Sequence, residues 1–196
     1  MRFIGITGGV GAGKSFVLSC LQEECNCRIV LADDVGNEVK MPGQPCYERI
    51  VELLGRDVLE TDGQINRQKM AAMIFTDEEL LKKVNEIIHP AVREYILNEV
   101  DKERKSGERE YFFLEAALLI EAGYEEILDE MWYIHADKEV RRARLKASRG
   151  YSDEKIDSIF ENQLSEEVFR AHCAVVIENN GEQEETRRQI RAALGC

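Results

Sequence analysis

The sequence predicts an α/β protein whose β-sheet is parallel and covered by helices on both faces. Five short apolar runs rich in β-forming residues recur along the 196 residues, and helical patterns separate them. Strands that alternate with helices require crossover connections, which favour a parallel sheet. The runs are continuously apolar rather than alternating, as expected for strands that are buried on both faces.

The individual elements follow from these patterns in chain order. The predicted strands are 2–7, 28–31, 111–114, 131–135 and 175–177. The predicted helices are 14–24, 46–54, 67–74, 77–88, 91–105, 138–148, 153–163, 166–173 and 182–194. Thr76 and Glu79 match a capping box, which predicts a helix start at that point. Pro90 fits the first position of a helix, so it is expected to separate helices 77–88 and 91–105.

The chain length fits a single domain, 1–196, that carries two helical additions. The core is expected to comprise 1–33, 108–140 and 174–196. The segment 34–107 is too long for one crossover helix, which predicts a helical subdomain. The segment 141–173 carries most of the clustered arginine and is interpreted as a helical lid.

Composition and charge exclude several classes of protein. Lys and Arg number 26 against 38 Asp and Glu, so the net charge of −12 argues against a protein that coats nucleic acid. No apolar run is long enough to cross a bilayer, and the N-terminus leads directly into a strand pattern rather than a signal segment. We therefore expect a cytoplasmic protein with no membrane partner, no nucleic-acid partner and no evident obligate protein partner.

The strongest motif is a match to Gly-x-x-x-x-Gly-Lys-Ser/Thr that begins at Gly8. A predicted strand precedes it and an apolar-periodic helix follows it, which is the context that a P-loop requires. Its glycines let successive backbone N–H groups point inward, and the helix N-terminus adds positive potential, so the loop can cradle phosphates. Lys14 is expected to reach the β- and γ-phosphates and Ser15 to ligate Mg²⁺. The expected nucleotide-binding residues of this segment are Gly8, Gly9, Val10, Gly11, Ala12, Gly13, Lys14, Ser15 and Phe16.

The motif narrows the fold to a P-loop NTPase type with a five-stranded sheet, and the rest of the chain narrows the class. The chain lacks the Asn-Lys-x-Asp sequence of a GTPase, and it is small for an ATP-driven motor. A small kinase that transfers the γ-phosphoryl group of ATP, with Mg²⁺, is the favoured interpretation. Two alternatives stay open: a nucleoside or nucleoside-monophosphate kinase, and a regulatory nucleotide-binding switch.

Two carboxylates follow predicted strands at the edge where parallel sheets bind ligands. Asp33 comes just after strand 28–31 and can accept the proton of an acceptor hydroxyl, or it can cap the next helix. Glu115 ends strand 111–114 and can hold Mg²⁺ through water, or it can be a surface carboxylate.

Five positive charges lie within nine residues of the predicted lid, from Arg141 to Arg149. Arg141 and Arg144 share one side of a helix, whereas Arg142 turns away. Forked hydrogen bonds from arginine stabilise a phosphoryl group in transfer, which favours Arg144 and Arg149 as catalytic residues over a solvated helix face.

Two further residues carry a structural and a functional interpretation each. His89 stands where one helix pattern stops, so it either hydrogen-bonds a helix end or contacts the substrate. Asn179 follows the last strand in a turn sequence, and its position at the carboxyl edge of the sheet also suits contact with adenine.

The chain resembles the dephospho-coenzyme A kinase family over most of its length. The similar segments occur in the family's order: Ile4–Ser15, Ala32-Asp33, Pro42-Gly43, Asn85–Pro90 with its His-Pro, Leu118–Glu121 and Val176–Gly181. The chain departs from the family pattern at Leu31, Asn37, Ala117, Ile159 and Ala174, and the spacing from Arg144 to Arg149 is one residue longer than usual.

The resemblance implies ATP-dependent phosphorylation of the ribose 3′-hydroxyl of dephospho-coenzyme A, the final step of coenzyme A biosynthesis. It also implies that segment 34–107 binds the coenzyme A moiety and that 141–173 is the lid. Carried over residue by residue, the catalytic residues are Asp33, Lys14 and Arg144 or Arg149. The implied substrate-binding residues are Asp33, His89, Leu118 and Glu121.

Overall fold

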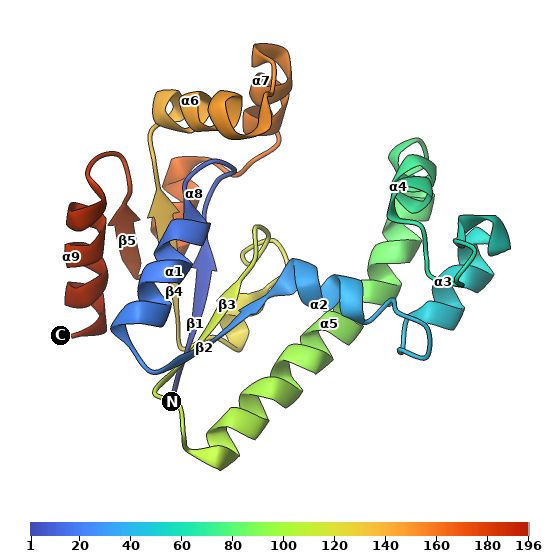
Figure 1. Ribbon diagram of the computed structural model, residues 1–196, viewed down its shortest axis with the longest axis horizontal. Coiled ribbons are helices and arrows are strands. Elements are labelled where there is room, and N and C mark those ends of the chain that lie inside the picture. The colour runs from blue at the N-terminus through green and yellow to red at the C-terminus, as the bar shows by residue number, and fades with distance from the viewer. Residues whose placement is uncertain (196) are drawn as a thin grey trace. The chain divides into compact units, whose positions relative to one another are not determined.

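The computed structural model describes residues 1–195 and contains a five-stranded parallel sheet with the order β2-β3-β1-β4-β5 (Figure 1). The strands are β1 (Arg2–Thr7), β2 (Cys27–Leu31), β3 (Tyr111–Glu115), β4 (Glu130–His135) and β5 (Val175–Glu178). Each begins and ends within one residue of the predicted span. The register pairs Ile4 with Phe113, Ile6 with Trp132, and Ile134 with Ile177. The predicted α/β class and parallel sheet are therefore confirmed.

The helices also follow the predicted order, with two exceptions treated below. They are α1 (Lys14–Glu24), α2 (Ala32–Glu38), α3 (Tyr47–Leu54), α4 (Arg67–Phe75), α5 (Glu78–Ser106), α6 (Lys138–Arg149), α7 (Asp153–Glu161), α8 (Glu166–His172) and α9 (Gln183–Leu194). Single 3-10 turns occur at Arg56–Val58 and Tyr124–Glu126. In the described part of the chain, no helix has the length and apolarity to span a membrane.

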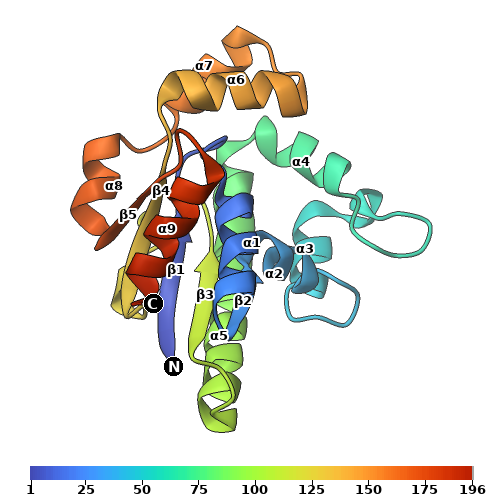
Figure 2. The ribbon, with the colours of Figure 1, turned by 60° about the vertical axis from the view of Figure 1, so that its left-hand side comes forward.

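Contacts divide the chain into two units. Met1–Ile29 together with Glu103–Cys196 forms the sheet unit, and Val30–Lys102 forms the helical unit. In the sheet unit, α1 packs on α9, α9 packs on β5 and α8 packs on β4. Helices α8 and α9 lie on opposite sides of the β4–β5 pair (Figure 2), so both faces of this part of the sheet are covered.

Aromatic side chains form much of the core of the sheet unit. Phe3 meets Phe112 edge-on at 5.3 Å between ring centroids, and Phe113 meets Trp132 at 5.8 Å. All four side chains are almost completely buried. Edge-to-face aromatic pairs add stability beyond the area that they bury, so these contacts fix the strands that lead to the loop after β1.

Helix α2 was not among the predicted helices. Its sequence, Ala-Asp-Asp-Val-Gly-Asn-Glu, contains Gly36 and Asn37, which are poor helix formers, and Val35 is its only buried residue. A single apolar position gives no 3.6-residue periodicity to detect. The helix is therefore set by its tertiary surroundings rather than by local propensity.

The predicted break between helices 77–88 and 91–105 is wrong, because α5 runs without interruption through Pro90. Proline removes one backbone hydrogen bond and crowds the carbonyl four residues earlier. Both Pro90 and Glu86 are exposed, so water can satisfy the released carbonyl. The predicted capping box is also wrong. The Asp77 carboxylate accepts the N–H of Leu80 at 2.9 Å, while Thr76 ends α4 and donates to the Met73 carbonyl.

Candidate active site

The loop between β1 and α1 is a phosphate cradle whose shape depends on glycine. Gly13 has a φ of 91°, and a Cβ at this position would lie 2.2 Å from the Asn179 amide nitrogen. At Gly9 a Cβ would lie 2.5 Å from the Arg141 guanidinium. Larger residues at either position would therefore displace the side chains that brace the loop.

Lys14 and Ser15 open α1 directly after the loop. The Lys14 ammonium donates to the Gly8 carbonyl at 2.7 Å and lies 3.6 Å from the Glu115 carboxylate at the end of β3. The Ser15 hydroxyl is on the exposed first turn of α1. The structure thus brings together a cation, a hydroxyl and a carboxylate at the carboxyl edge of the sheet.

This donor set suits Mg²⁺. A serine hydroxyl and one carboxylate are hard oxygen ligands, and Mg²⁺ is typically held by one or two such groups together with substrate phosphates and water. Among residues 1–195 there is no cluster of three or more His, Cys, Asp or Glu that could form an all-protein metal site. Ser15 and Glu115 therefore fit a metal that arrives with a nucleotide.

Arg144 bridges the loop and the end of β5. Its guanidinium donates to the Asn179 carbonyl at 2.8 Å and to the Ala12 carbonyl at 3.2 Å. Arg144 therefore lies against the glycine loop through two backbone carbonyls, and its predicted catalytic role stays a prediction.

Arg141 contacts the same loop from one turn earlier on α6. Its Nε donates to the Val10 carbonyl at 2.9 Å, and the guanidinium also bonds Gln163 and stacks 4.3 Å from the centre of the Phe160 ring. Burial lowers the pKa of Arg141, and no carboxylate lies within ion-pair distance of it among the described residues. The shared side of Arg141 and Arg144 was visible in the sequence, but Arg141 was not among the predicted site residues.

The other two arginines of α6, Arg142 and Arg149, contact residues outside the glycine loop. Arg142 pairs with Asp153 and Asp157 of α7, as its position on the helix predicts. Arg149 is exposed at the end of α6, where its guanidinium lies 5.8 Å from the centre of the Tyr151 ring. The structure therefore brings Arg144, but not Arg149, to the loop.

The Asn179 side chain is hydrogen-bonded to the glycine loop. Its side chain is buried, with the amide nitrogen donating to the Ala12 carbonyl at 2.8 Å and the amide oxygen accepting from the Thr186 hydroxyl at 3.1 Å. Both ends of the amide are thus occupied inside the protein. This arrangement makes Asn179 a positioning residue for the loop, and the predicted adenine contact stays a prediction.

Two predicted substrate residues follow β3 in the sheet unit. Leu118 is 56% exposed, whereas its neighbour Leu119 is completely buried. Glu121 is also exposed, three residues further along. An exposed leucine on a segment anchored by a buried one is available for an apolar contact with a ligand.

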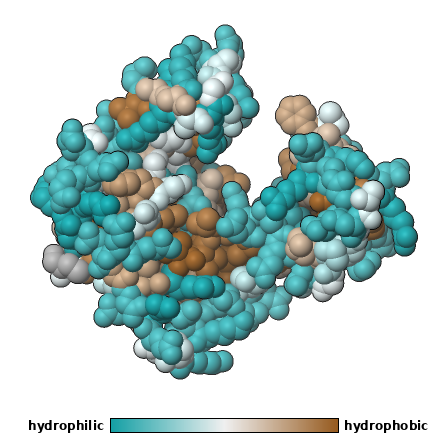
Figure 3. Space-filling model, viewed as in Figure 1, coloured by the Kyte–Doolittle hydropathy of each residue, from teal (hydrophilic) through white to brown (hydrophobic). Residues whose placement is uncertain are grey.

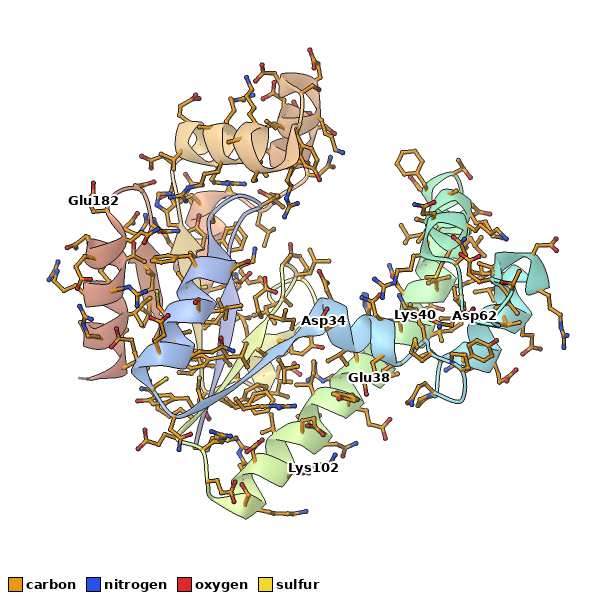
Figure 4. All side chains as sticks on the ribbon, viewed as in Figure 1. Asp34, Glu38, Lys40, Asp62, Lys102 and Glu182 are labelled. Carbon is orange, nitrogen blue, oxygen red and sulfur yellow. The ribbon has the colours of Figure 1, made fainter. Side chains whose placement is uncertain are left out.

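In the helical unit, Asp33 lies in the first turn of α2 and is exposed. The residue at the N-cap position is Leu31, and no side chain caps this helix, so the helix-cap interpretation of Asp33 is wrong. Figure 4 labels its neighbour Asp34 on this turn. The Asp33 carboxylate is therefore exposed and does not cap α2.

His89 lies inside α5 rather than at a helix end, so the helix-end interpretation is wrong. Its exposed ring lines an open cavity of about 570 Å³ along one face of α5, together with Asn85 and Pro90. The predicted contact of His89 with the substrate stays a prediction.

A parallel sheet whose strand β1 runs into a glycine loop, followed at once by Lys14 and Ser15, defines a P-loop nucleotide-binding protein of the small kinase type. A family model described as dephospho-CoA kinase matches residues 2–185. The chain is 37% identical to the dephospho-CoA kinase of Geobacillus kaustophilus, over 97% of this chain and 94% of that protein. It is 36% identical to that of Carboxydothermus hydrogenoformans, over 99% and 93%. The chain therefore belongs to the dephospho-CoA kinase family, a family of phosphotransferases that act in coenzyme A biosynthesis.

Solved structures agree with this fold. The crystal structure of TT1252 from Thermus thermophilus superposes with a TM-score of 0.83 at 29% identity, covering 99% of this chain and 96% of that one. The dephospho-CoA kinase from Campylobacter jejuni gives a TM-score of 0.75 at 20% identity, covering 100% and 96%. A shikimate kinase from Bacteroides thetaiotaomicron, at 13% identity and a TM-score of 0.56, shares the fold alone.

Proposed function

We propose that the protein transfers the γ-phosphoryl group of ATP to the ribose 3′-hydroxyl of dephospho-coenzyme A, releasing ADP and coenzyme A. The observation that carries this proposal is the glycine loop, with the Lys14 ammonium across it and the Arg144 guanidinium braced against it, in a member of the dephospho-CoA kinase family. In the reaction the acceptor oxygen loses its proton and bonds to the γ-phosphorus, while the bond between that phosphorus and the ADP oxygen breaks.

Each residue has a distinct part in this reaction. The backbone N–H groups of the loop and the N-terminus of α1 bind the β- and γ-phosphates. Lys14 leaves the Gly8 carbonyl to neutralise phosphate charge, and Arg144 adds positive charge from the lid. Asp33 orients the 3′-hydroxyl and accepts its proton. Its exposed carboxylate, next to the carboxyl end of β2, supports this role.

Ser15 and Glu115 would hold Mg²⁺, with Glu115 acting through water. When bound, the ion neutralises charge on the phosphate oxygens. The segment 34–107 is proposed to bind the acceptor, with His89 among its contacts, while Leu118 and Glu121 contact the acceptor from the segment after β3. The segment 141–173 is proposed to act as the lid that excludes water.

We further propose a cytoplasmic enzyme that needs no nucleic acid and no obligate protein partner. The net charge of −12 supports the absence of a nucleic-acid partner.

The test is a pair of neighbouring substitutions. Asp33 and Asp34 are both exposed in the first turn of α2, so Asp34→Asn is a matched control for Asp33→Asn. Asp33→Asn should lower kcat with dephospho-coenzyme A by about 10²-fold or more while ATP binding is retained, and Asp34→Asn should leave kcat nearly unchanged. Lys14→Ala should weaken ATP binding itself. If Asp33→Asn keeps its full kcat, Asp33 is not the base.

A further inference from the structure

Two cysteines, Cys25 and Cys27, lie where α1 ends and β2 begins, at the opposite end of α1 from the glycine loop. Both are partly exposed, whereas Cys20, Cys46 and Cys173 are buried. Figure 3 shows the face of the sheet unit on which α1 lies, where apolar residues reach the surface between hydrophilic ones. Because the eleven residues of α1 extend over about 16 Å, the pair lies outside the phosphate cradle.

The sulfur atoms of this pair lie against the same backbone oxygen. The Cys25 thiol donates to the Leu21 carbonyl at 3.2 Å, and the Cys27 thiol donates to it at 3.6 Å. The Cys25 N–H donates to this oxygen as well, at 3.1 Å. A carbonyl oxygen has two lone pairs and a thiol is a weak donor, so the oxygen cannot fully satisfy all three groups. The two thiols are therefore held side by side by weak bonds.

The surroundings of Cys27 include two groups that favour its thiolate. Burial raises the pKa of the Cys27 thiol, while a hydrogen bond with the Cys25 side chain and the charge of Arg109 act in the opposite direction. The Arg109 guanidinium is fixed by a bond to the Asn26 side-chain oxygen at 2.7 Å, and the Asn26 amide nitrogen donates to the Glu108 carbonyl at 2.6 Å. A thiolate on Cys27 thus has a hydrogen-bond donor and a cation beside it, as an attacking thiol requires.

The backbone spacing of the pair suits a disulfide. Cys25 is extended, with φ −148° and ψ 160°, and Cys27 is the first residue of β2. Residues two apart in an extended segment carry their side chains on the same side, with Cα atoms about 6.6 Å apart. Disulfides join Cα atoms about 4.4–6.8 Å apart.

A metal is a poorer match for the same two thiols. A structural thiolate site for zinc takes four protein ligands. Within residues 1–195, no group of three or more His, Cys, Asp or Glu is arranged to hold a metal ion. The geometry therefore favours covalent chemistry between the two sulfur atoms over metal binding.

We propose that Cys25 and Cys27 form a reversible disulfide by exchange with low-molecular-weight disulfides such as glutathione disulfide. The Cys27 thiolate attacks one sulfur of glutathione disulfide, whose S–S bond breaks and releases one glutathione. The Cys25 thiol then loses its proton and attacks the Cys27 sulfur of the mixed disulfide, which releases the second glutathione. The protein loses two electrons and two protons, and glutathione disulfide is reduced to two glutathione molecules. This chemistry is independent of the nucleotide and of the acceptor.

Mass spectrometry of the wild-type protein after treatment with glutathione disulfide tests the site. Remaining thiols are blocked with N-ethylmaleimide in denaturant, and a protease that cleaves after glutamate separates peptide 25–38 from Cys20. This peptide should be lighter than its reduced form by two hydrogen atoms and carry no N-ethylmaleimide. Reduction with dithiothreitol before blocking should restore both labels. A peptide that keeps both thiols, or that carries stable glutathione in place of the internal bond, would overturn the proposal.

Single substitutions test the assigned order of attack. Cys25→Ser removes the second thiol, so it should lose the internal disulfide and retain one glutathione on Cys27. Cys27→Ser should also lose the disulfide and should take up glutathione on Cys25 more slowly. The control is Cys46→Ala, which removes a buried thiol of the helical unit and should form the disulfide to the wild-type extent. Faster uptake by Cys27→Ser than by Cys25→Ser would overturn the order, and loss of the disulfide in Cys46→Ala would overturn the pair as the site.

Discussion

Replacing Asn179 by alanine tests whether this residue supports the glycine loop or reads adenine. The substitution removes the bond to the Ala12 carbonyl at 2.8 Å and the bond from the Thr186 hydroxyl at 3.1 Å. Both are buried, and each buried hydrogen bond contributes about 1 kcal/mol, with more lost where a partner is left unsatisfied. We therefore expect the free energy of unfolding to fall by about 2–3 kcal/mol. For a protein of this length that corresponds to a Tm lower by about 5–10 °C.

Binding measurements complete this test. A loop-supporting Asn179 affects every phosphate ligand, so Asn179→Ala should weaken the binding of ATP and of inorganic triphosphate by similar factors. The control is Asn180→Ala, because the Asn180 side chain accepts a bond from the Asp137 N–H and makes no contact with the loop. This control should change Tm and both affinities little. A variant with wild-type Tm that loses affinity for ATP but not for triphosphate would refute the reasoning and favour the adenine contact.

Three further predictions follow from the same contacts. Arg144→Met should weaken triphosphate binding about tenfold in calorimetry, since the bonds to Ala12 and Asn179 are lost; the exposed Arg188→Met, which loses only a pair with Glu185, should not. Iodoacetamide at neutral pH should label the partly exposed Cys25 and Cys27 before Cys20, Cys46 and Cys173, as read by peptide mapping, because burial protects the last three and raises the pKa of Cys173 to about 12; early labelling of Cys173 would contradict this. Lys40→Met should raise Tm at neutral pH. Burial lowers the pKa of Lys40, so its ammonium loses its proton at a lower pH in the folded protein than in the unfolded protein. As pH rises towards the ordinary lysine pKa, the wild-type protein should therefore gain stability. The difference in Tm between the wild-type protein and Lys40→Met should then shrink. A constant difference across that range would refute the buried-charge explanation.

The sequence predicted those parts of the structure that local chemistry determines. The loop after β1, with Lys14 and Ser15 at the start of α1, follows from one motif and its flanking apolar runs. The break at Pro90 was wrong because an exposed helix face tolerates a lost hydrogen bond, which depends on solvent access and not on the residue type.

The parts that could not be predicted depend on contacts between distant segments. Arg141 and Arg149 carry the same charge, and only the fold shows that Arg141 stacks on Phe160 and reaches Val10 while Arg149 lies over Tyr151. Asn179 lies 167 residues from its partner Ala12. Such pairings require the sheet topology, which a single sequence specifies only in outline.

The most direct test of the central claim is the rate of ADP release with Mg²⁺ and ATP in the presence of one acceptor at a time, with the product mass measured alongside. The acceptors are dephospho-coenzyme A, adenosine, AMP, CMP and none. The account predicts selective turnover of dephospho-coenzyme A, a product with the mass of coenzyme A, and slow ADP release without an acceptor. Turnover of a nucleoside or nucleotide alone would contradict it, as would rapid ATP hydrolysis that no acceptor accelerates.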